Sequence, residues 1–326
     1  TPGTSTSRRR RARDERRTCT FTAPLRRSTV RSPSTPGRLC AVRAEQITEP
    51  LALHGEGPCW LARTGEMAWV DMLAGRMLAT SPAGGATRVI DIPGPVAAIV
   101  RPRAGGGLVV ATEKGVVLLD DADVPATLCE IVDEPGIRMN DGSCDPQGRF
   151  WCGTMAYDAR DGAGSLYRVE ADGSFATALG GVTISNGLGW SPDGATAFYV
   201  DSMAHGIDCF AFDGAGGELG ERRRFAEVDS TLGLPDGIAV DAEGGVWVAL
   251  WDGAAVRRYA PDGTLDAVVP LPCGRVTACA FGGDDLSQLF ITTSRLELPD
   301  GVDPAGGSLF RCEPGVRGQA VLEFAG

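Results

Sequence analysis

A short pattern of residue types recurs along this chain and constrains its fold more than any other feature. Within Leu234–Gly253, an acidic residue precedes a short apolar strand, a tight polar turn and an aromatic-rich second strand. The stretches Asn140–Met155 and Asn186–Ser202 show the same order of features. Related polar turns between two short strands recur about every 40–50 residues, and they begin at Arg63, Arg103, Asp145, Ser191, Asp241 and Gly282. Repeats of this period are typical of arrays and propellers.

The repeats predict an all-β fold. Each unit contains three or four short strands with alternating apolar positions, a pattern that favours antiparallel meanders. The chain also contains 45 Gly and 21 Pro, which suit many tight turns. Six similar units predict a six-bladed β-propeller of antiparallel four-stranded blades over residues 45–326, because a sandwich or barrel does not readily produce six similar units. We expect a strand near residues 44–53 to close the ring by pairing with the last blade.

Residues 1–44 differ in composition from the rest of the chain. They contain twelve Arg but two acidic residues, and they are rich in Ser, Thr and Pro. Such a segment cannot bury an apolar core, so we expect it to be disordered. It suits either a transit peptide processed near residues 41–44 or a low-complexity leader without a targeting role. We therefore expect a cytoplasmic protein, or a plastid or mitochondrial one if the segment is a transit peptide.

The remaining residues are strongly acidic, which argues against nucleic acid as a ligand because attraction to phosphate dominates that affinity. A metal cation or a neutral polar substrate suits this charge better. No apolar run is long enough to span a membrane. The two histidines, His54 and His205, exclude a three-His zinc site. The ten Cys residues lack a Cys-x-x-Cys pair and are expected to be reduced and mostly buried.

Four polar residues occupy matching positions near the innermost strands of four units: Glu56, Asn140, Asn186 and Asp236. Since innermost strands line the channel of a propeller, these side chains should converge. Two carboxylates and two amides form an oxygen-rich cage that suits a hard divalent cation. A single Asn-Gly or Asp-Gly pair more often marks a turn, but matching positions in four units favour a site. Acidic residues within the turns themselves, such as Asp241, are expected to be structural.

The chain resembles the senescence-marker-protein, gluconolactonase and luciferin-regenerating family, which includes regucalcin. The resemblance covers residues 50–312 and rests on five motifs in order: GEGPCW, RMNDGSCDPQGRFWCGTM, ISNGLGWSPDG, PDGIAVDAEGGVWVA and CAFGGDD with LFITT. It implies hydrolysis of a sugar lactone by water that one divalent cation activates, and calcium, zinc, magnesium and manganese all suit the ligands.

The resemblance also implies a role for individual residues. Its metal ligands correspond to Glu56, Asn186 and Asp236, and its substrate contacts correspond to Arg138, Asn140 and Asp158. Asp236 is the candidate for both ligand and general base. Regucalcin has Glu where Asp158 stands, and the segment Tyr157–Gly164 looks shorter than in regucalcin, so we expect a different lid and sugar selectivity.

Three other functions suit the same fold. The first is a calcium-binding regulatory propeller without catalysis, and the second is a phosphotriesterase that uses the same cation. The third, a protein-binding scaffold, would need no acidic cage in the channel. A Ser-His-Asp hydrolase is disfavoured because the chain lacks a Gly-x-Ser-x-Gly elbow and has only two His. The sequence leaves the lactone, the metal and the oligomeric state open.

Overall fold

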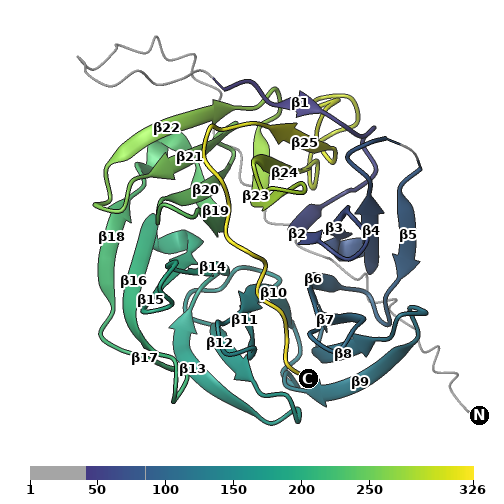
Figure 1. Cartoon of the computed structure of the whole chain (residues 1–326), viewed down its shortest axis with the longest axis vertical. Coiled ribbons are helices and arrows are strands. Elements are labelled where there is room, and N and C mark those ends of the chain that lie inside the picture. The colour runs from purple at the N-terminus through teal and green to yellow at the C-terminus, as the bar shows by residue number, and fades with distance from the viewer. Residues whose placement is uncertain (1–41, 85) are drawn as a thin grey trace, which may run out of the picture. The chain divides into compact units, whose positions relative to one another are not determined.

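The structure is a computed structural model that describes residues 42–84 and 86–326. Its strands form six antiparallel sheets in a ring around a central channel (Figure 1). The chain is therefore a six-bladed β-propeller, as the repeats predict. The first β-strand begins at Glu45, and residues 1–41 of the predicted leader lie outside the described residues. The expectations for that segment stay predictions.

The strands fall into four positions within the blades, from the channel outward. The innermost strands are β2 (Gly55–Leu61), β6 (Ala97–Pro102), β10 (Ile137–Cys144), β14 (Ser185–Trp190), β19 (Leu234–Val240) and β23 (Arg275–Gly282). The second strands are β3 (Glu66–Asp71), β7 (Leu108–Thr112), β11 (Phe150–Ala156), β15 (Thr196–Asp201), β20 (Val246–Trp251) and β24 (Gln288–Ser294). The third strands are β4 (Arg76–Thr80), β8 (Gly115–Leu119), β12 (Gly164–Val169), β16 (Gly206–Asp213), β21 (Ala255–Tyr259) and β25 (Leu309–Cys312). The outermost strands are β5 (Arg88–Asp91), β9 (Pro125–Glu130), β13 (Phe175–Val182), β18 (Arg223–Glu227), β22 (Leu265–Pro270) and β1 (Glu45–Gln46).

Few other segments of the described residues have regular secondary structure. A short strand, β17 (Glu218–Leu219), also pairs with β16. The helical segments of the described residues are three 3-10 turns: η1 (Met72–Ala74), η2 (Ser202–Ala204) and η3 (Ser230–Leu232). Within the same residues, no helix has the length and apolar character needed to cross a membrane.

The ring closes through its last blade, as predicted. β1 pairs antiparallel with β25, so a strand from the start of the propeller completes a sheet made by its end. In this pairing Glu45 lies opposite Arg311, and the two side chains form an ion pair. The blade cannot form without both ends of the domain, which couples the folding of the ring to its closure.

The turn between the first two strands of a blade is organised by a buried aspartate in two blades. Asp241 accepts hydrogen bonds from the backbone N–H of Gly245 at 2.8 Å and from Trp247 Nε1 at 2.9 Å. Its partner Arg258 donates from Nε at 2.6 Å. Asp145 repeats the arrangement with Trp151 Nε1 at 3.0 Å. These contacts confirm that the turn aspartates are structural.

Aromatic side chains pack the blades against one another. Trp69, Trp151 and Trp247 are each at most 1% exposed, and Trp60 and Trp190 are also buried. The eight cysteines of the described residues are free and mostly buried, as expected. The apolar core therefore lies within and between blades, and the channel is left to other side chains.

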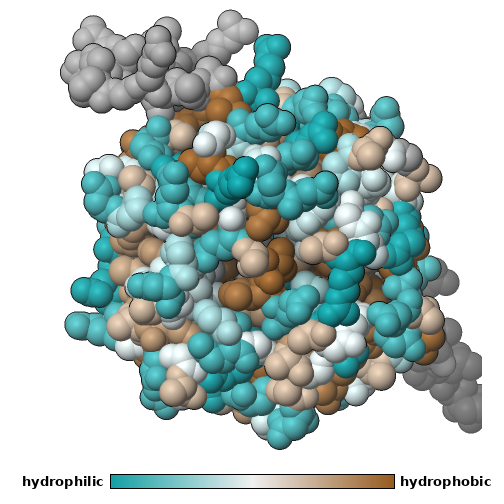
Figure 2. All heavy atoms as spheres, in the orientation of Figure 1, coloured by the Kyte–Doolittle hydropathy of each residue, from teal (hydrophilic) through white to brown (hydrophobic). Residues whose placement is uncertain are grey.

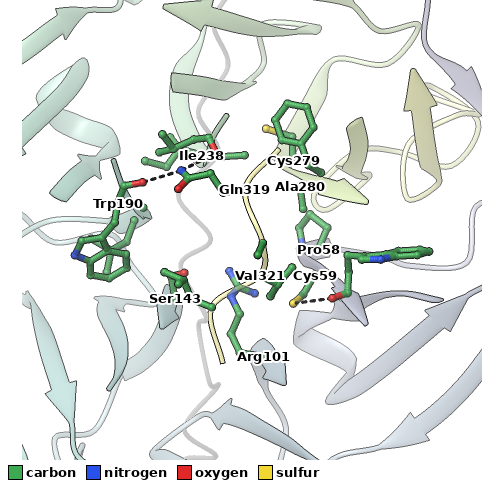
Figure 3. Close-up of a pocket in the computed structure, with 18 residues that line it drawn as sticks. Pro58, Cys59, Arg101, Ser143, Trp190, Ile238, Cys279, Ala280, Gln319 and Val321 are labelled. Atoms are coloured by element: carbon green, nitrogen blue, oxygen red, sulfur yellow. Dashed lines mark hydrogen bonds between the residues drawn. The ribbon is translucent and has the colours of Figure 1, made fainter. Parts of the chain in front are cut away.

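The C-terminal segment, residues 316–326, crosses one end of the channel (Figures 1 and 3). Gln319 Nε2 donates to the carbonyl oxygens of Trp190 and Val240 at 3.0 and 3.1 Å. Further along, Phe324 is fully buried and exchanges backbone hydrogen bonds with Pro102 and Ala104 at 2.9 and 2.8 Å. Apolar atoms gather at the centre of this face (Figure 2). The segment thus ties together blades on opposite sides of the ring.

We expect Phe324→Ala to lower the free energy of unfolding by about 3–5 kcal/mol, because it removes a fully buried ring from the core. Urea unfolding followed by tryptophan fluorescence measures the change. Glu323→Ala is the matched control, since Glu323 is exposed and its loss should cost less than about 0.5 kcal/mol. If Phe324→Ala lowers the free energy of unfolding as little as Glu323→Ala does, the buried ring of the crossing segment does not contribute to stability.

Candidate active site

A break in strand register occurs at the same place in the innermost strand of every blade. Each break lies between two residues of the strand, and in chain order the pairs are Glu56/Cys59, Ala97/Ile99, Met139/Gly142, Ser185/Leu188, Pro235/Ile238 and Val276/Ala278. A β-bulge of this kind bends the strand and redirects its side chains. The four predicted cage residues lie at or within these bulges, inside their strands and not ahead of them as the sequence suggested.

The glycines that follow the cage residues have a packing role. A Cβ atom at Gly237 would lie 2.5 Å from Ala278 Cβ, and one at Gly187 would lie 2.7 Å from the carbonyl oxygen of Asp236. Each contact joins one innermost strand to the next. The Asn-Gly and Asp-Gly pairs are therefore not turns: glycine allows neighbouring innermost strands to approach closely, and this brings the polar residues together.

The two asparagines of the cage are directly connected. Asn140 Nδ2 donates to the carbonyl oxygen of Ser185 at 2.8 Å and to Asn186 Oδ1 at 3.3 Å. Asn186 Nδ2 donates to Ser202 Oγ at 2.9 Å. The side-chain Nδ2 of each asparagine donates to a neighbouring group. These hydrogen bonds fix the orientation of both side-chain amides, including their oxygens. The oxygen of Asn186 faces Asn140.

Glu56 and Asp236 are 4% and 5% exposed and influence each other's ionisation. Burial raises the pKa of Glu56 well above its ordinary value, and the negative charge of Asp236 raises it further. Burial also raises the pKa of Asp236. Asp236 Oδ1 is buried and has no hydrogen-bond partner among the described residues. A pair of buried carboxylates with an unsatisfied oxygen is the arrangement expected of a site that receives a cation.

A third carboxylate, Asp141, lies beside the cage. It is 7% exposed and accepts a hydrogen bond from the backbone N–H of Gly142 at 2.7 Å. Burial raises the pKa of Asp141. Its charge in turn contributes to the raised pKa of both Glu56 and Asp236. The cage therefore concentrates negative charge more strongly than its predicted members alone.

Arg138 is buried at 6% exposure and is not a surface ion-pair residue. Its Nη1 donates to Asn140 Oδ1 at 2.6 Å and to the carbonyl oxygen of Met139 at 3.0 Å. The ring of Tyr157 lies over the guanidinium at 5.7 Å, and the Tyr157 hydroxyl donates to Glu113 Oε1 at 2.8 Å. Arg138 Nε is buried without a hydrogen-bond partner among the described residues, so this donor is unsatisfied.

Asp158 is the one predicted site residue that the structure does not bring to the cage. It is exposed on the loop after β11 and pairs with Arg160 at 3.0 Å. The preceding residue, Tyr157, is 49% exposed and contacts Arg138. The loop thus begins next to Arg138, and the role of Asp158 stays a prediction.

Three side chains beside the cage were missed by the motif pattern. His54 Nε2 lies 3.8 Å from Glu56 Oε1, and its Nδ1 lies 3.0 Å from Ser294 Oγ. The ring of Trp251 meets that of His54 edge-on at 5.7 Å, and Arg275 stacks on Trp251 at 4.7 Å. Trp251 therefore joins His54 and Arg275 beside the cage. The signal in the sequence was weak, because each residue comes from a different blade.

The other end of the channel is a poorer candidate. A hollow of about 120 Å³ lies there against the C-terminal segment, lined by the later residues of the innermost strands, such as Cys59, Trp190 and Cys279 (Figure 3). Ligand pockets usually occupy about 300–1,000 Å³. The hollow also lacks the converging carboxylates of the cage, so the start of the innermost strands is the better site.

The chemistry of the donors is consistent with one divalent cation. Glu56, Asn186 and Asp236 supply carboxylate and amide oxygens, which hard cations prefer. Across residues 42–84 and 86–326, no group of three or more His, Cys, Asp or Glu is arranged to hold a metal. The predicted triad contains only two such side chains, since its third member is an amide. The unsatisfied Oδ1 of Asp236 is the observation that favours a cation at these three residues.

The fold and the cage together define a propeller with an oxygen-donor site at one end of its channel. The sequence profile of the SMP-30/Gluconolactonase/LRE-like region matches residues 54–295. The chain belongs to this family, as the motifs predicted.

The chain is also similar in sequence and structure to individual named proteins. The chain is 36% identical over 288 residues to 6-deoxy-6-sulfogluconolactonase of Pseudomonas putida, covering 86% of this chain and 97% of that protein. It is 35% identical over 272 residues to Pentonolactonase XacC of Haloferax volcanii, covering 81% and 92%. Among solved structures, it is similar to a calcium-binding protein, regucalcin, from Agrobacterium tumefaciens, with a TM-score of 0.80, 30% identity and coverage of 87% and 97%. The family thus includes sugar lactonases and regucalcin.

We expect Gly237→Ala to lower the free energy of unfolding by about 1–3 kcal/mol, because the added methyl group would overlap Ala278 of the next innermost strand. Chemical denaturation measures the effect. Gly274→Ala is the matched control, since a Cβ there meets no atom within 4 Å. If Gly237→Ala is as stable as Gly274→Ala, close packing between innermost strands does not require glycine at position 237.

Proposed function

We propose that this protein hydrolyses sugar lactones with the help of one divalent cation held by Glu56, Asn186 and Asp236. The observation that carries the proposal is the pair of buried carboxylates with the unsatisfied Asp236 Oδ1, next to an arginine with a free donor. Membership of a family with named sugar lactonases supports the substrate class. When bound, a divalent cation supplies Lewis acidity that polarises a carbonyl and makes water a stronger nucleophile.

The side chains around the cage have complementary tasks. Arg138 donates from its free Nε to an oxygen of the sugar, while its Nη1 stays on Asn140. Asn140 is fixed by Ser185 and therefore holds Arg138 in a constant orientation. The ring of Tyr157 covers the guanidinium and keeps water from that side. Together these contacts orient the lactone ring relative to Asp236.

Asp236 is the proposed general base. Its carboxylate accepts a proton from water as the water oxygen forms a bond to the lactone carbonyl carbon. The bond between that carbon and the ring oxygen then breaks, and the proton passes to the ring oxygen. The product is an open-chain hydroxy acid. Substrate contact by Asp158 is proposed as well, through movement of its exposed loop toward the site.

A second candidate is calcium binding without relevant catalysis, which the likeness to a regucalcin described as calcium-binding favours. Both candidates use the same cage. The catalytic candidate is preferred because the cage is accompanied by Arg138 and Asn140, which a pure cation site does not need. A phosphotriesterase would use the same groups, and turnover of paraoxon beside D-glucono-1,5-lactone separates the two activities.

We expect Asp236→Asn to lower kcat/KM for D-glucono-1,5-lactone by roughly 10²–10⁴-fold, because it removes the general base. The fold should persist, since the substitution also removes repulsion between buried carboxylates. A pH-indicator assay measures hydrolysis, and circular dichroism confirms folding. Asp193→Asn, on an exposed turn, is the matched control and should retain full activity. Near-normal turnover by Asp236→Asn would contradict the assignment.

We expect EDTA treatment to abolish lactone hydrolysis, and calcium, zinc, magnesium or manganese to restore it. Isothermal titration of the stripped protein with each ion should show one site. In Asn186→Ala, binding of the restoring ion should weaken, because one of three protein ligands is lost. A stripped protein that remains fully active would rule out dependence on a removable cation, and ion binding without hydrolysis of any lactone would favour the calcium-binding candidate.

A further inference from the structure

Arg275 lies at the edge of the cage, where the first strand of the last blade begins. It pairs in register with Ser294 of β24, whose hydroxyl contacts His54. The Arg275 side chain is 13% exposed, and its guanidinium stacks on the ring of Trp251 at 4.7 Å. The stacking restricts the plane of the guanidinium. Arg275 is therefore a cation held in a nearly fixed orientation.

The hydrogen-bond donors of Arg275 are only partly used. Its Nε pairs with Asp252 Oδ1 at 3.2 Å, and the Asp252 side chain is exposed. Its Nη1 is buried and has no hydrogen-bond partner among the described residues. An unpaired buried donor, and above all a charged one, is costly unless a ligand or water satisfies it. The residue is therefore better suited to bind a ligand than to stabilise the free protein.

Two residues, Trp251 and His54, link Arg275 to the cage. Trp251, on which Arg275 stacks, meets His54 at 5.7 Å, and His54 Nε2 lies 3.8 Å from Glu56 Oε1. These contacts place the stack of Arg275 on Trp251 at the border of the cage.

We propose that Arg275, supported by Trp251, binds an oxyanion carried by the substrate at a distance from the lactone carbonyl. The inference rests on the proposed lactonase function and specifies its substrate class: lactones that bear a carboxylate, phosphate or sulfonate group. Arginine suits such a group because its planar fork matches two oxygens at once. The stacked ring holds that fork in place before the substrate arrives.

The overall charge of the chain does not oppose this preference at short range. The chain has a formal net charge of −11, which on its own favoured a cation or a neutral substrate. Interactions between exposed charges are largely screened beyond about 8 Å at physiological ionic strength. A buried guanidinium in direct contact with an anion is screened much less. The local charge of the subsite therefore decides the selectivity.

The test compares two lactones with the same five-membered ring. D-Glucaro-1,4-lactone bears a carboxylate where D-glucono-1,4-lactone bears a hydroxymethyl group. We expect the wild-type protein to prefer the charged lactone, and Arg275→Gln to reduce the ratio of kcat/KM values, charged over neutral, by roughly 10–100-fold. The change should appear mainly in KM, because the contact is made in both ground and transition states.

Two further variants make the result specific. Arg275→Lys keeps a cation but loses the fork, so it should retain part of the ratio, and it serves as the second variant if Arg275→Gln does not fold. Arg295→Gln removes an equal charge from an exposed position next to Ser294 and should leave the ratio unchanged.

Equal losses on both lactones in Arg275→Gln would overturn the subsite and indicate a structural role through Asp252. A wild-type protein without preference for the charged lactone would also overturn it. If the wild-type protein hydrolyses neither lactone with any added divalent cation, the lactonase function is contradicted instead. In that case, binding of D-glucarate that is equally strong in wild type and Arg275→Gln would overturn the subsite independently.

Discussion

Close packing of six innermost strands around one channel is the constraint on which the rest of this structure depends. Neighbouring innermost strands approach so closely at Gly187 and Gly237 that a Cβ atom would overlap the adjacent strand. The same approach places the bulge of each strand at the channel, and the bulges carry the polar side chains of the cage. Outer strands, turn aspartates and the crossing C-terminal segment maintain the ring that makes this approach possible. The close packing that forms the ring therefore also forms the site.

The cage conflicts with the usual rule that buried charges are paired. Glu56, Asp141 and Asp236 are all buried, which raises the pKa of each, and repulsion by neighbouring carboxylates raises the pKa of Glu56 and Asp236 further. Compare the turn aspartate Asp241, which is fully buried but has four hydrogen-bond donors around it. The Asp241 carboxylate stabilises the fold, while Asp236 Oδ1 is left without a hydrogen-bond partner among the described residues. Unsatisfied polar groups of this kind are expected where a ligand completes the structure.

The number of blades and most residues of the cage could be predicted from the sequence, because a residue's place in a repeat indicates its place in a blade. Six matching units predicted six blades, and residues at equal places in the units were predicted to meet at the channel. The glycines after Asn186 and Asp236 were harder to interpret, since an Asn-Gly or Asp-Gly pair suggests a turn when only the local chain is considered. Trp251 and Arg275 were missed as site residues because they follow no repeat. Each gains its role from neighbours on other blades.

The sequence by itself determined the architecture, the family and the residues of the cage, because periodic patterns and motif order are properties of the chain alone. Tertiary structure decided the rest. It buried Arg138 beneath Tyr157, left Asp236 Oδ1 without a partner, and kept Asp158 on an exposed loop. It also stacked Arg275 on Trp251 at the edge of the site. Burial, orientation and unmet hydrogen bonds arise only when separate blades come together, and no local pattern of residues encodes them.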